Sequence, residues 1–124
     1  MKIYKQVFLL IISMGFVLNS SLVIAHTAVT ITVPKNGAVL SESPKEIILR
    51  FSDEAYLNSI SLIDEQGGVV PLANSLPEAL ARRLSISLPS LKDGSYTVIW
   101  SAEGTDTHVI QGELSFSVES LPQQ

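Results

Sequence analysis

Residues 93–101 read DGSYTVIWS, a turn followed by a strand in which every second side chain is apolar. Asp-Gly is a frequent hairpin turn, and the alternation after it places Tyr96, Val98 and Trp100 on one face. A tyrosine directly after such a turn occupies the position of a tyrosine corner, which is typical of immunoglobulin-like domains. We therefore expect Tyr96 to form such a corner and Trp100 to lie in the core.

The same alternation recurs in six other short stretches, separated by turn residues. These stretches are residues 28–33, 45–51, 59–63, 69–72, 82–88 and 113–118. Seven short strands with turns between them predict an all-β protein, a seven-stranded antiparallel Greek-key β-sandwich of immunoglobulin-like type. In that architecture the amino terminus and the loops 52–58 and 102–112 lie at one end of the sandwich.

Residues 1–25 have the pattern of a cleaved secretory signal peptide. Lys2 and Lys5 give a positive start, residues 7–18 are mostly apolar, and Val23-Ile24-Ala25 precedes the expected cut. The apolar part is short and interrupted, so an uncleaved membrane anchor is the less favoured alternative. We expect residues 26–124 to form one domain of 99 residues in the periplasm, a monomer without membrane insertion after cleavage.

The composition of the expected mature chain restricts its partners and its metal ligands. Without Lys2 and Lys5, six basic side chains face twelve acidic ones, which disfavours nucleic acid and anionic membranes. The chain has no cysteine, and its two methionines, Met1 and Met14, lie in the leader. Soft sulfur ligands for Cu(I) are therefore absent from residues 26–124, and only nitrogen and oxygen donors remain.

Cleavage after Ala25 would give His26 a free α-amine, so that amine and imidazole nitrogens could chelate one metal ion. The other histidine, His108, follows Asp106 in a D-x-H spacing within the loop expected at the same end. In extended backbone, side chains at i and i+2 point to the same side. Three nitrogens with one or two oxygens favour Cu(II). Asp53, in the other loop at that end, is a candidate for a weak or outer contact.

Each of these residues also has an ordinary alternative. His108 could be a polar loop residue, Asp106 could cap a turn, and His26 could follow the leader by chance. Acidic loop residues such as Asp53 are usually only solvated. The sequence alone leaves these alternatives open.

At this point the chain resembles the CopC family of periplasmic copper-binding proteins over nearly all of residues 26–124. The resemblance rests on His26, on 34–37 (PKNG), 49–53 (LRFSD), 93–100 (DGSYTVIW) and 105–108 (TDTH), and on Gly112 with 114–116 (LSF). It implies a β-sandwich that binds one Cu(II) ion through His26, Asp106 and His108. Asp53 stands where similar proteins commonly have Glu, and the methionine-rich Cu(I) site of some members has no counterpart here.

The leading hypothesis is a periplasmic Cu(II) carrier or buffer that contributes to copper resistance or homeostasis and is not an enzyme. The resemblance also implies an inner-membrane partner of the CopD type. One alternative is a copper-dependent oxidative enzyme that uses an amino-terminal histidine brace. The other is a metal-free immunoglobulin-like interaction module, because one fold hosts many functions.

Overall fold

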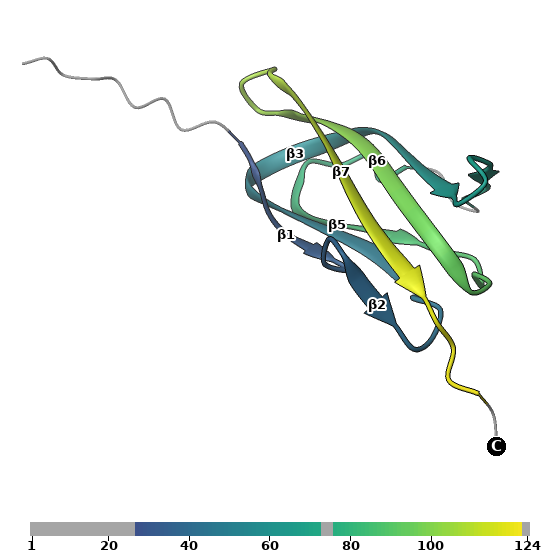
Figure 1. Cartoon of the computed structure of the whole chain (residues 1–124). Coiled ribbons are helices and arrows are strands. Elements are labelled where there is room, and N and C mark those ends of the chain that lie inside the picture. Colours follow the sequence, from purple (N-terminus) through teal and green to yellow (C-terminus); the bar gives the residue numbers. More distant parts are fainter. Residues whose placement is uncertain (1–26, 73–75, 123–124) are drawn as a thin grey trace, which may run out of the picture.

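The computed structural model describes residues 27–72 and 76–122, where all the regular structure is β-strand. Within these ranges, no helix is long and apolar enough to span a bilayer. The expected all-β class is confirmed (Figure 1). The strands are β1 Val29–Val33, β2 Ala38–Leu40, β3 Glu46–Asp64, β4 Val69–Val70, β5 Ala81–Ser87, β6 Gly94–Gly104 and β7 Val109–Val118.

The long strand β3 takes part in both layers of the sandwich. Its first part, residues 46–51, lies between β1 and β5, and its later part pairs with β6 and, at its end, with β4. The pairing register with β5 shifts between Arg50 and Ala55. This irregularity marks the bend at which β3 passes from one layer to the other (Figure 1).

The predicted division of this region into two strands with a loop at 52–58 was wrong, because β3 is continuous from Glu46 to Asp64. Three successive exposed polar residues, Ser52, Asp53 and Glu54, occupy the bend. A strand that changes layers presents these residues to solvent on both faces, so the apolar alternation stops there. The sequence therefore has the pattern of a loop although the hydrogen-bonded ladder resumes at Ala55.

Strand β2 was not among the strands predicted from the sequence. After Val33-Pro34 the chain turns through residues 35–37, and β2 pairs with β7 in parallel, through Ala38 with Phe116 and Leu40 with Val118. All other strand pairs are antiparallel. Three residues are too few to show a period of two, so the expected wholly antiparallel arrangement was wrong at this edge.

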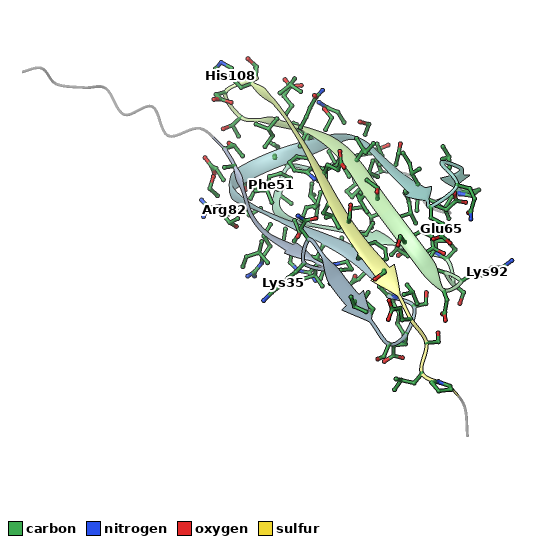
Figure 2. All side chains as sticks on the ribbon, in the orientation of Figure 1. Lys35, Phe51, Glu65, Arg82, Lys92 and His108 are labelled. Carbon is green, nitrogen blue, oxygen red and sulfur yellow. The ribbon has the colours of Figure 1, made fainter. Side chains whose placement is uncertain are left out.

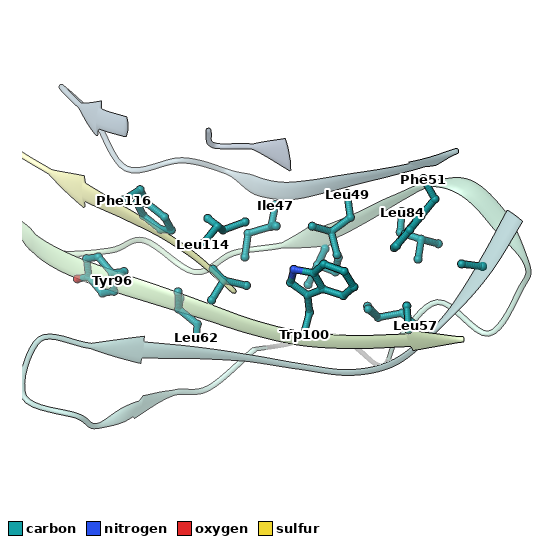
Figure 3. Close-up of a cluster of buried hydrophobic side chains, with 14 of the residues drawn as sticks. Ile47, Leu49, Phe51, Leu57, Leu62, Leu84, Tyr96, Trp100, Leu114 and Phe116 are labelled. Carbon is teal, nitrogen blue, oxygen red and sulfur yellow. The ribbon is translucent and has the colours of Figure 1, made fainter. Parts of the chain in front are cut away.

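The core lies between the two layers (Figure 3), and most of its side chains are ones that alternation placed inward. Ala55, Leu57 and Ala102 are also buried in it, although they fall in the predicted loops 52–58 and 102–112. Phe51 of β3 packs edge-to-face on Trp100 of β6, with ring centroids 5.8 Å apart, and joins the layers. Trp100 is only 6% exposed, as expected. Tyr96 stacks on Phe116, and its hydroxyl donates to the Lys92 carbonyl at 2.7 Å, which confirms the tyrosine corner.

Candidate metal centre

A four-residue turn, 105–108, joins β6 to β7 and carries the D-x-H motif. Both strands extend further than expected, which shortens the predicted loop 102–112. Gly104 N–H donates to the His108 carbonyl at 3.1 Å, and Thr107 N–H donates to the Gly104 carbonyl at 3.0 Å. Thr107 has a φ of 68°, a left-handed conformation that is uncommon for a β-branched residue. Two backbone hydrogen bonds and the left-handed residue Thr107 therefore define the conformation of this turn.

Within this turn, the carboxylate of Asp106 binds His108 twice. Asp106 Oδ1 accepts the His108 backbone N–H at 3.2 Å, and Asp106 Oδ2 lies 2.8 Å from His108 Nδ1. The bond from the His108 ring, followed by that from its backbone N–H, holds the pKa of Asp106 below its ordinary value. The carboxylate is therefore maintained as an anion beside the imidazole.

The two side chains face each other, as predicted, but not for the predicted reason. The backbone at 106–108 is not extended; the turn and the Asp106 bond to His108 N–H bring the groups together. The 2.8 Å separation of Asp106 Oδ2 and His108 Nδ1 is that of a hydrogen bond, which holds the carboxylate and the imidazole next to each other. The side chains are 36% and 69% exposed, so an ion can reach them from solvent. Figure 2 shows His108 at the tip of this hairpin.

His26 lies outside the described residues, but the next residue, Thr27, lies against the D-x-H turn. A Cβ built on Gly104 would lie 2.7 Å from Thr27 Oγ1 and 3.0 Å from Asp106 Oδ1. Thr27 is 8% exposed, so the beginning of the described chain is packed against this turn. Within residues 27–72 and 76–122, no three His, Cys, Asp or Glu side chains gather closely enough to hold a metal ion.

Asp53 lies on the bend of β3, and its carboxylate is engaged elsewhere. Asp53 Oδ1 accepts the Glu54 N–H at 2.8 Å and lies 3.5 Å from Arg82 Nη2 on β5. Both side chains of this ion pair are more than half exposed, so it contributes little to stability. Figure 2 shows Arg82 well separated from His108.

Sequence reasoning missed Thr27 and Gly104, which adjoin the turn, and Ser52, which is bonded to the residue after Thr27. Ser52 and Ala28 are joined by two hydrogen bonds, one in each direction, beside the bend of β3. None of the three is a metal ligand type that a motif would single out. A weak signal was available for Ser52, because three polar residues in succession interrupt an otherwise regular strand pattern.

A CopC domain matches residues 29–119. The chain belongs to the CopC family. Among solved structures, CopC from Methylosinus trichosporium OB3b is 27% identical, with a TM-score of 0.68, over 80% of this chain and 99% of that one. PcoC, a methionine-rich copper resistance protein from Escherichia coli, is 28% identical, with a TM-score of 0.59, over 77% of this chain and 100% of that one. A second PcoC structure, of the selenomethionine protein, is 26% identical to this chain, with a TM-score of 0.58, over 74% of this chain and 99% of that one.

Membership of the CopC family confirms the predicted resemblance and the β-sandwich class. None of the curated protein sequences matches this chain. One difference from the relatives is visible in composition: PcoC is named as methionine-rich, whereas this member has only Met1 and Met14. Both precede the residues that the CopC domain matches.

Proposed function

We propose that this CopC-family protein binds one Cu(II) ion and carries or buffers copper in the periplasm, as part of copper resistance or homeostasis. The ligands would be the α-amine and imidazole of His26, the carboxylate of Asp106 and the imidazole of His108. One observation carries the proposal: Asp106 and His108 face each other in a turn against which Thr27, the residue after His26, is packed.

The donor set supports Cu(II) rather than Cu(I). A carboxylate and imidazole and amine nitrogens suit Cu(II), whereas thiolates and thioethers select Cu(I). Residues 26–124 contain neither cysteine nor methionine. Because Asp106 is already held as an anion, it needs no deprotonation on metal binding. The bound ion is cargo, and no catalysis is proposed.

Two further parts of the proposal concern location and partners. The leader pattern in residues 1–25 supports export and cleavage after Ala25, which would create the amine ligand. An inner-membrane protein of the CopD type is proposed as the partner that receives or delivers the copper. The protein is proposed to act as a monomer.

The proposal is tested with the chain that begins at His26. Titration against a competing chelator should show one Cu(II) per chain, and electron paramagnetic resonance should show nitrogen and oxygen ligands in a tetragonal field. His108→Ala should weaken binding by more than about 100-fold, because loss of even an outer partner of a metal ligand costs 10–100-fold. Asp93→Asn, an acidic position at the opposite end of the sandwich, is the control. Unchanged binding by His108→Ala would refute the site.

A further inference from the structure

The segment Thr27–Ala28, which directly follows the proposed amino-terminal ligand, is held by two separate features of the fold. The first involves Ser52 at the bend of β3. Ala28 N–H donates to Ser52 Oγ at 3.0 Å, and Ser52 N–H donates to the Ala28 carbonyl at 2.8 Å. Both backbone polar groups of Ala28 are thereby fixed to one residue, and one of the two bonds depends on the serine side chain.

The second feature is a notch at Gly104, the last residue of β6. The φ angle of Gly104 is not in the left-handed region, so the backbone itself does not require glycine there. Glycine is required there by the lack of space. An added Cβ would lie 2.7 Å from Thr27 Oγ1 and 3.1 Å from Thr27 Cβ, well inside van der Waals contact. The same Cβ would press on Asp106 Oδ1 at 3.0 Å. The absent side chain thus lets Thr27 and Asp106 lie next to each other.

We propose that Gly104 and Ser52 are positioning residues, which seat the Thr27–Ala28 segment and so bring the amino-terminal residue to the Asp106–His108 pair. This inference rests on the proposed function, since it concerns the same metal site. Consecutive Cα atoms are about 3.8 Å apart, so seating Thr27 next to Asp106 limits how far from this turn the amino-terminal Cα can be. Seating the segment in advance lowers the ordering cost that is incurred when the ion binds.

The test uses chains that begin at His26 and carry Gly104→Ala or Ser52→Ala. Each should lower Cu(II) affinity by about 10–100-fold, the usual effect of losing an outer partner of a ligand. Electron paramagnetic resonance should show fewer nitrogen ligands, and the Ala28 amide of the metal-free protein should exchange faster with solvent. Ser52→Thr, which retains the hydroxyl, should restore both the affinity and the spectrum.

The controls separate positioning from general damage to the fold. Gly68→Ala also brings a Cβ to 3.0 Å from a carboxylate, that of Asp64, but at the opposite end of the sandwich, and should leave Cu(II) affinity unchanged. Ser59→Ala alters an exposed serine of the same strand and should also have no effect. If the Gly104→Ala protein does not fold, Ser52→Ala still tests the positioning role. Its fold should be retained, because the backbone bond from Ser52 N–H to the Ala28 carbonyl remains.

Two outcomes are distinguishable. Parental affinity and an unchanged spectrum in both Gly104→Ala and Ser52→Ala, with loss of binding in His108→Ala, would overturn the positioning role and leave the proposed copper site standing. Unchanged binding in His108→Ala as well would refute the site itself, and with it the positioning role.

Discussion

Replacing Gly112 by alanine should destabilise the fold more than any glycine substitution at the surface. Gly112 of β7 pairs directly with Trp100 of β6, and the indole ring lies over the glycine. A Cβ at this position would lie 2.5 Å from Trp100 Cε2 and 2.8 Å from Nε1, and closer still to Cζ2. Carbon atoms pack best at about 3.5–4.0 Å, so the ring or the strand must move by roughly 1 Å or more.

The surroundings of Trp100 leave little room for that movement. The ring is 6% exposed and meets Phe51 edge-to-face at 5.8 Å, the contact that joins the two layers. Overpacking a core costs about 1–3 kcal/mol, and the rigid ring places Gly112→Ala near the upper value, about 3 kcal/mol. A domain of this size loses about 4–8 °C of Tm per kcal/mol, so Tm should fall by about 12–24 °C.

Urea and thermal unfolding followed by circular dichroism measure this loss. In a Trp100→Leu background the added methyl group meets no indole ring, so Gly112→Ala should cost at least about 1 kcal/mol less there. Gly68→Ala is the matched control, because its nearest neighbour is the flexible end of Asp64. A Gly112→Ala protein within about 0.5 kcal/mol of the parent, or an equal loss in both backgrounds, would refute the reasoning.

Three other predictions concern the tyrosine corner and the metal site. Burial, and then the carboxylates of Asp64, Glu65 and Asp93, raise the pKa of Tyr96, so stability should be retained below about pH 10 and fall as the pH rises further. Tyr96→Phe should cost about 1 kcal/mol at pH 7 through the lost Lys92 bond and show less of this alkaline loss in urea melts. Asp106→Asn, which removes the anionic donor, should weaken Cu(II) binding at least about tenfold in chelator competition, and equal binding would exclude the carboxylate as a ligand. One glycine added before His26 acylates the amine, so unchanged affinity and spectrum in that protein would rule out the chelating amino terminus.

The sequence predicted most of the strands because apolar and polar residues alternate in a strand that has one buried face. Leu49, Val98 and Phe116 all lie in stretches of period two, and all are buried. This alternation is lost where a strand no longer has one face against the core, or is too short to show it. At Ser52–Glu54 β3 changes layers, and at Ala38–Leu40 the strand is too short for a period to appear. Both errors concern how strands are joined into layers, which local pattern does not encode.

The D-x-H pair was predictable for a related reason. Asp106 and His108 are two residues apart, and a carboxylate with an imidazole at that spacing is visible as a motif. Their mutual geometry was not visible, because it depends on a turn with Thr107 in a left-handed conformation rather than on an extended strand. The role predicted for Asp53 stays a prediction, although its carboxylate lies beside Arg82.

The proposed metal site joins the amino terminus to the D-x-H turn through contacts that no local sequence pattern reveals. Residue 27 is separated from residue 104 by most of the domain, and only the folded sandwich brings Thr27 into the notch that Gly104 leaves. A glycine that is required by space rather than by a positive φ has no signature in a single sequence. Without such an anchor, a metal ion that uses the amino terminus as a ligand would itself have to order the chain end, which lowers affinity. The proposed positioning role therefore predicts that substitutions at Ser52 and Gly104 change metal affinity while all the proposed ligands stay in place.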